Sequence, residues 1–259
     1  MEKVSVNGIS LAYERRGKGA PLLLAHGFPL DHSTWEALAS QLENDFELIM
    51  PDLRGFGQSE APAGAYTVEQ MADDLNELLN ALKIRQTYIA GHSMGGYIAL
   101  AFARAHPERV LGLGLIGSQA APDSPEAKAG RYATVQKLSQ EDVKVLAGMA
   151  EKLSANPDHA PFFLEIILSQ RATGMMGALQ AMAERPDSGP FLASAKFPVV
   201  LVHGLADALI PHERARQIKS LLPGAMLSEL AGIGHSPALE APVETARALR
   251  KLTGKNSSQ

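Results

Sequence analysis

The chain has 259 residues, of which 46% are hydrophobic and 20% charged, and 24 basic against 28 acidic side chains give a formal net charge of −4. This composition is typical of a folded globular protein, and it provides neither the basic surface of a nucleic-acid-binding protein nor a polybasic patch for anionic membranes. Cysteine is absent, which excludes disulfides, thiolate catalysis and cysteine-ligated metals.

The apolar stretches are too short for a membrane-spanning helix, which needs roughly 20 residues, and the first residues lack the apolar run of a signal peptide. We therefore expect a cytoplasmic protein that acts on a small molecule, with no nucleic-acid or membrane partner. The sequence does not indicate an oligomeric state.

The first residues predict a β-hairpin. Val4 and Val6 alternate with polar neighbours, Asn7-Gly8 suits a tight turn, and ISLAYER supplies the returning strand. Short apolar runs then alternate with segments of helical period. The runs are PLLLA, FELIM, TYIA, VLGLGLI, FPVVLV and AMLSEL.

Runs that are apolar on both faces suit a buried parallel sheet, and strand–helix alternation favours an α/β fold. We predict a mostly parallel central sheet with helices on both faces and the hairpin antiparallel at one edge. The clearest helix begins after Thr67, which forms a capping box with Gln70 and precedes an amphipathic stripe.

Residues 119–190 interrupt this alternation with several expected helices and no strand signal. Turns are expected near Asn156-Pro157 and Pro186. Phe162, Phe163, Ile166 and Ile167 form an apolar face, and Met149, Met175, Met176 and Met182 add adaptable surface. We predict a helical cap over 119–190, inserted in a core made of 1–118 and 191–259, with Arg185 and Asp187 anchoring its return.

A candidate nucleophile lies between the expected strand TYIA and the next helix. Gly91-His92-Ser93-Met94-Gly95 is a G-x-S-x-G motif in the strand–turn–helix context that gives this motif its meaning. The glycines let the backbone pass closely through a strained turn. Ser93 is thus the expected nucleophile, and the N–H of Met94 at the helix start faces a developing oxyanion.

A serine hydroxyl needs a neutral imidazole as its base and a carboxylate that orients this imidazole. In an α/β fold of this kind, the acid and then the histidine are expected to follow the nucleophile in the chain, each in a loop after a strand. Asp207 follows the apolar run FPVVLVHG, and His235 follows AMLSELAG. Ser118 and Asp123, after VLGLGLI, are the alternative to Asp207.

The other histidines suit the role of base less well. His26, His92 and His203 are expected to shape loops, and His212 is too close to Asp207 in the chain. His32, His106 and His159 have no strand-end context.

The loop His26-Gly27-Phe28-Pro29, after PLLLA, is expected to supply the second oxyanion donor. The N–H of Phe28 is the candidate, because proline has none. Its ring, together with Phe162 and Met175, is expected to contact substrate.

Five segments together resemble the α/β-hydrolase superfamily: HGFPLDHSTW, PDLRGFGQSE, GHSMGG, the loop of Asp207 and GIGHSP. The resemblance is to the branch of 3-oxoadipate enol-lactonases, small carboxylesterases and non-haem haloperoxidases, which are perhydrolase-like esterases. It implies Ser93, Asp207 and His235 as a catalytic triad and the N–H groups of Phe28 and Met94 as an oxyanion hole. A serine nucleophile disfavours the dehalogenase and epoxide hydrolase chemistry of the superfamily, which uses aspartate.

The remaining polar residues have structural interpretations. Asp52 and Arg54 are expected to fix a loop and Trp35 to pack in the core, while Asp31 and His32 lie near the expected mouth of the site. The G-x-G-x-x-G fingerprint, the P-loop and the H-E-x-x-H zinc motif are absent from the sequence, so we expect no cofactor and no metal.

The sequence therefore favours a serine hydrolase acting on an ester or lactone of a small, largely apolar compound. A perhydrolase with the same triad and a carbon–carbon bond hydrolase are alternatives. A non-catalytic small-molecule binder on this scaffold is disfavoured by the intact triad.

Overall fold

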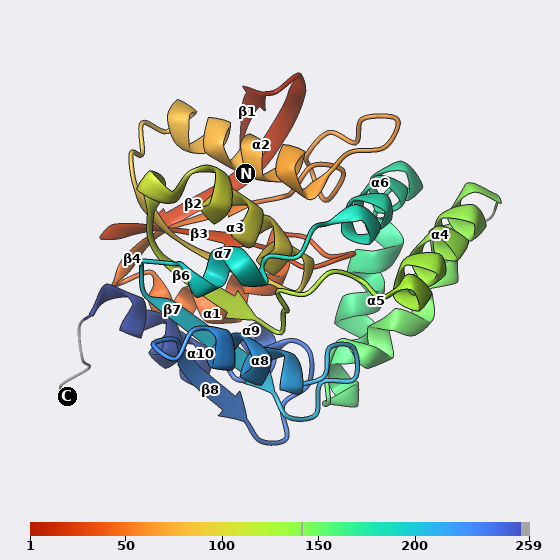
Figure 1. The fold of residues 1–259 in the computed structure, drawn as a ribbon. Helices are drawn as coiled ribbons and strands as arrows, with labels where there is room; N and C mark the ends of the chain where they lie inside the picture. The colour runs from red at the N-terminus through yellow and green to blue at the C-terminus, as the bar shows by residue number, and fades with distance from the viewer. Residues whose placement is uncertain (141, 255–259) are drawn as a thin grey trace.

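The computed structural model describes residues 1–140 and 142–254. Its eight strands form one sheet in the order β1-β2-β4-β3-β5-β6-β7-β8 (Figure 1). The strands are β1 (Glu2–Val6), β2 (Ile9–Gly17), β3 (Ala20–Ala25), β4 (Phe46–Pro51), β5 (Thr87–His92), β6 (Val110–Ile116), β7 (Val199–Gly204) and β8 (Met226–Leu230). No helix in the described part of the chain has the length and apolar character that crossing a bilayer requires.

The predicted hairpin at the edge of a mostly parallel sheet is confirmed. β1 pairs antiparallel with β2, β2 pairs antiparallel with β4, and the remaining neighbours are parallel. Asn7 (φ 43°) and Gly8 (φ 78°) both occupy the left-handed region at the turn. Such a turn matches the twist of the two strands that it joins.

Helices cover both faces of the sheet (Figure 1). One face carries α2 (Val68–Ala81), α3 (Met94–Ala105) and α8 (Glu213–Leu221), and the other carries α1 (Glu36–Leu42), α9 (Pro237–Glu240) and α10 (Pro242–Arg250). Within β3, Leu23 and Ala25 join the first core and Leu22 and Leu24 the second. A strand buried on both faces has to be apolar at every position, which explains the continuous runs in the sequence.

The start of α2 agrees with the prediction in detail. The Thr67 hydroxyl accepts from the Gln70 N–H at 3.1 Å, and the Gln70 side chain accepts from the Thr67 N–H at 3.0 Å. The apolar stripe of this helix is buried against the sheet, while Trp35 is 1% exposed and packs in the opposite core, as expected.

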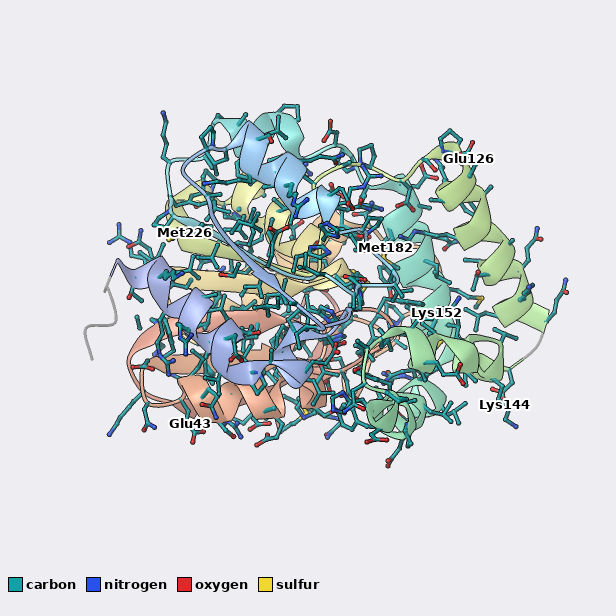
Figure 2. All side chains as sticks on the ribbon, turned by 90° about the horizontal axis from the view of Figure 1, so that it is seen from below. Glu43, Glu126, Lys144, Lys152, Met182 and Met226 are labelled. Carbon is teal, nitrogen blue, oxygen red and sulfur yellow. The ribbon has the colours of Figure 1, made fainter. Side chains whose placement is uncertain are left out.

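Between β6 and β7 the chain leaves the sheet and forms cap helices. These are α4 (Pro125–Gln140), α5 (Ala160–Ser169) and α6 (Ala172–Glu184), with 3-10 segments Val143–Lys152 and Pro157–His159. The next helix, α7 (Gly189–Ala193), packs against α8 and leads back to β7. α4, α5 and α6 stand together beside the sheet in Figure 1. In Figure 2, Met182 lies between the cap and the core, whereas Glu126 and Lys144 lie on the outer margin of the cap.

The cap helices correct one expectation. Met175 and Met182 were expected to be adaptable surface, but they are 0% and 2% exposed. The reason is that α6 packs between α4 and the core, so it is covered on both sides.

Arg185 joins the cap to the core, as predicted. Its guanidinium lies 4.0 Å from the centre of the Tyr97 ring on α3 and donates to Asp123 at 2.6 Å and to the Ala121 carbonyl at 3.0 Å. Asp187, by contrast, accepts a local bond from the Gly189 N–H and no other that reaches the core among the described residues. Because Asp123 is held by arginine, it is not available as the alternative acid.

Candidate active site

Ser93 occupies a strained turn between β5 and α3. Its backbone angles, φ 52° and ψ −115°, are unusual for a residue with a side chain. The surroundings leave no space for a Cβ on the neighbouring glycines: one on Gly95 would lie 1.9 Å from the Ala25 carbonyl oxygen, and one on Gly91 would lie 2.1 Å from that of Gly95. The glycines of the motif are therefore required by close packing.

Asp207 and His235 form a direct hydrogen bond. The two residues follow the neighbouring strands β7 and β8, and Nδ1 of His235 lies 2.8 Å from Oδ2 of Asp207, with both side chains at most 1% exposed. A carboxylate only accepts, so Nδ1 carries a proton in this hydrogen bond. In a neutral ring the lone pair is then on Nε2, which is the tautomer that a general base requires.

Asp207 is held in its loop by four donors. Oδ1 accepts from the backbone N–H groups of Leu209 (2.8 Å) and Ile210 (2.9 Å), and Oδ2 also lies 3.2 Å from Nε2 of His203. Burial opposes the charge of Asp207, but the hydrogen bonds from His203 and His235 outweigh it and hold the pKa of this carboxyl well below its usual range. Asp207 is therefore ionised at neutral pH.

His203 has a larger role than the sequence indicated. It shapes the loop as expected, because its Nε2 also lies 2.9 Å from the Ile210 carbonyl. Both neighbours of this nitrogen are acceptors, so it carries a proton. The sequence could not reveal that the same N–H also faces Asp207.

The end of β6 brings the nucleophile turn and the acid–base pair together. The Ser93 N–H donates to the Ile116 carbonyl at 2.9 Å. At the next residue, Gly117, a Cβ would lie 2.9 Å from the His235 carbonyl oxygen and 3.6 Å from Oδ2 of Asp207. The turn of Ser93 and the Asp207–His235 pair thus lie in neighbouring loops at the carboxyl edge of the parallel sheet. No hydrogen bond joins the Ser93 hydroxyl to the imidazole among the described residues.

His92 fills the space beside Ser93. Its Nε2–H donates to the His235 carbonyl at 2.7 Å, and the two rings are 4.9 Å apart. Burial, together with the nearby His235, lowers the pKa of His92 to about 3. A neutral, hydrogen-bonded ring of this kind fixes a loop, as predicted, and does not titrate near pH 7.

The two predicted oxyanion donors lie on either side of the nucleophile turn. Met94 directly follows Ser93, and the loop of Phe28 approaches so closely that a Cβ on Gly27 would lie 2.8 Å from Nδ1 of His92. The N–H groups of Phe28 and Met94 donate no hydrogen bond to another residue in the described part of the chain. Both N–H groups are thus unpaired within the described residues, as the predicted role requires.

The three predicted substrate contacts differ in exposure. Phe28 is 5% exposed and packs edge-to-face on Phe56, with ring centres 6.0 Å apart. Phe162 is half-buried beside Phe163 on α5, and Met175 is completely buried in α6.

Asp52 and Arg54 form structural contacts, as expected. Arg54 donates two 2.7 Å bonds to the buried Asp74, and Oδ1 of Asp52 accepts from the N–H of His32 at 2.9 Å and from its Nδ1 at 2.7 Å. Asp31, His32 and Asp52 are residue types that bind metals, and their ligand atoms lie within 4.8 Å of one another. Since these atoms already bond one another or the backbone, the cluster is explained by loop structure.

Comparisons with known proteins identify the family. Residues 20–164 match the family model described as alpha/beta hydrolase fold. Lipase 1 of Psychrobacter immobilis is 30% identical over 255 residues, which cover 93% of this chain and 79% of the lipase.

Two solved structures are similar over nearly the whole chain. A thermophilic esterase from Thermogutta terrifontis is 36% identical with a TM-score of 0.93, covering 98% of each chain. The enol-lactonase from Burkholderia xenovorans LB400 is 25% identical with a TM-score of 0.90, covering 98% of this chain and all of that one. The chain belongs to the α/β hydrolase family.

Proposed function

We propose that the protein is a serine hydrolase that cleaves a carboxylic ester or lactone of a small, largely apolar compound through an acyl-enzyme on Ser93. The observation that carries the proposal is the 2.8 Å bond between Nδ1 of His235 and Asp207, which leaves Nε2 as the ring nitrogen that can act as the base. The similarity to an esterase and an enol-lactonase supports this class of substrate.

In the first step, Nε2 of His235 takes the proton of the Ser93 hydroxyl as its oxygen attacks the substrate carbonyl. The N–H groups of Phe28 and Met94 donate to the oxyanion, and Asp207 stabilises the imidazolium. The imidazolium then protonates the leaving alcohol, which leaves an acyl group on Ser93. In the second step the same base activates water, which releases the acid.

The apolar side chains define the expected substrate. Phe28, Phe162 and Met175 come from the oxyanion loop and from two cap helices, and all three are aromatic or thioether groups with no charge. An apolar acyl or alcohol group is expected to contact Phe162, the most accessible of the three, whereas Met175 is completely buried and contacts substrate only if the cap rearranges.

The test uses purified wild-type protein and the Ser93→Ala variant. A panel of nitrophenyl esters and lactones should be hydrolysed by the wild type alone, and a fluorophosphonate probe should label Ser93. The variant should keep its melting temperature, because the hydroxyl makes no hydrogen bond in the described structure.

Two further assays separate the alternatives, which would use the same residues. Peroxide-dependent bromination that exceeds ester hydrolysis would favour a perhydrolase. Cleavage of a vinylogous diketone with little action on esters would favour a carbon–carbon bond hydrolase. Retained esterase activity in Ser93→Ala would refute the proposal.

A further inference from the structure

The carboxylate of Glu240, in α9, accepts hydrogen bonds from two segments that are far apart in the chain. Oε1 accepts from the Ser236 N–H at 3.1 Å, and Oε2 accepts from the N–H groups of Gly234 (3.0 Å) and Ala155 (2.9 Å). Gly234 and Ser236 flank His235, whereas Ala155 lies in the cap. One side chain therefore joins the cap to the loop of the proposed base.

The two segments are also in direct van der Waals contact. A Cβ on Gly234 would lie 2.4 Å from the Ala155 nitrogen and 2.9 Å from the Ser154 carbonyl carbon. The backbone of Gly234 is outside the left-handed region, unlike that of Gly232, so the cap and not the turn requires a glycine here.

The cap segment that makes this contact is itself ordered by local interactions. The Ser154 hydroxyl accepts from the Asn156 N–H at 3.0 Å and lies 2.9 Å from Nδ1 of His159, and the preceding Leu153 is completely buried. These contacts tie the segment to the cap, so a displacement of the cap would act on the Glu240 carboxylate.

We propose that Glu240 is a positioning residue that couples the cap to His235, so that movement of cap residues 153–155 changes the placement of the base. This inference rests on the role proposed above for His235. Because a displacement of about 1 Å in a reacting group costs about 10²-fold in rate, a small shift of the cap is sufficient to switch the base between productive and unproductive positions.

The first test compares substitutions of Glu240 by ester hydrolysis, with rates normalised to the concentration of folded protein. Glu240→Ala removes all three bonds, and kcat should fall about 10²-fold, with KM changing much less. Glu240→Gln keeps one oxygen and places an NH₂ group against at least one N–H donor. We therefore expect roughly a tenfold fall in kcat. The control is Glu244→Gln, an exposed residue in the first turn of α10.

The second test measures hydrogen–deuterium exchange and does not depend on activity. Glu240→Ala should speed exchange both in the peptide containing 234–236 and in the cap peptide containing 153–156. Gly234→Ala keeps the carboxylate but pushes the cap away, so it should speed exchange in both peptides and lower kcat.

The outcomes separate the two proposals. If Glu240→Ala and Gly234→Ala speed exchange at 234–236 alone, or keep the wild-type kcat, the coupling is wrong while the serine hydrolase proposal stands. If no ester or lactone is cleaved by the wild type, the exchange data still decide whether Glu240 links the two segments. Melting temperatures of all variants identify any that fail to fold, and Glu240→Gln, which keeps the side-chain shape, then carries the test.

Discussion

Replacing Asp207 with asparagine tests the proposed acid–base pair by exchanging one carboxylate oxygen for an NH₂ group. The native carboxylate accepts on both oxygens: Leu209 and Ile210 donate to Oδ1, and His235 and His203 lie against Oδ2. An amide has one oxygen and one NH₂ group. Its oxygen should take the Oδ1 position, since the reverse orientation would set NH₂ against two backbone N–H donors.

In this orientation the NH₂ group faces Nδ1 of His235. The imidazole then has to accept at Nδ1 and carry its proton on Nε2, which prevents Nε2 from taking the proton of Ser93. The lost carboxylate charge, about 4 Å from the ring, is worth about 4 kcal/mol at an effective dielectric constant of about 20. This alone is roughly 10³-fold in rate, and with the wrong tautomer we expect roughly 10³- to 10⁴-fold lower kcat/KM.

The assay is hydrolysis of a nitrophenyl ester from about pH 5 to 9. Asp158→Asn, at an exposed carboxylate in the cap, is the control. A folded Asp207→Asn variant that keeps more than about a tenth of wild-type kcat/KM would refute this reasoning, because a tenfold loss is only about 1.4 kcal/mol.

Three further substitutions test contacts around the site. Burial opposes the charge of His32, but the bonded Asp52 outweighs it and raises the pKa of His32. Its protonated form therefore stabilises the fold below the ordinary pKa of about 6.5, and this stabilisation is lost as pH rises through the raised value. His32→Gln should lower the melting temperature more at about pH 5 than at pH 8, and equal losses would contradict the ion pair. Gly95→Ala places a Cβ 1.9 Å from a backbone oxygen and should cost about 3 kcal/mol or more in urea denaturation; an unchanged midpoint would show that the turn is not tightly packed. Asp74→Asn breaks the buried pair with Arg54 and should cost about 3 to 5 kcal/mol, with little change in kcat/KM of the folded enzyme. A large fall in kcat/KM without loss of stability would instead indicate that Arg54 contacts substrate.

The positions of the main site residues could be predicted because parallel strands end at one edge of the sheet. Ser93, Asp207 and His235 each follow an apolar run that the structure confirms as a strand. The order of the strands was not needed for this, since any parallel arrangement of β5, β7 and β8 places the loops on the same side. The hydrogen bond between Asp207 and His235 is what the structure adds.

The supporting contacts could not be predicted, because they depend on loop conformation. His203 reaches Asp207 only because the loop turns back at Ile210, and no periodic pattern encodes that turn. The burial of Met175 depends on α4 covering α6, and α4 has only Leu138 buried, so its own sequence gives little sign of its packing. A helix that packs only on another inserted helix shows a weaker periodicity of apolar residues than a helix that packs on a sheet, because the flat face of a sheet requires a continuous apolar stripe.

The placement of His235 depends on three contacts that come from different elements. Asp207, after β7, bonds the ring; His92, at the end of β5, bonds the carbonyl; and Glu240, in α9, bonds the N–H groups on both sides. The first two partners belong to the sheet and its loops, which are the most buried part of the fold. Of these three partners, only the Glu240 carboxylate also accepts from a cap residue, Ala155, within the described residues. Two of the three contacts come from the sheet and its loops, and they hold the proposed base in place. A change in the cap can therefore shift His235 directly through the hydrogen bonds of Glu240.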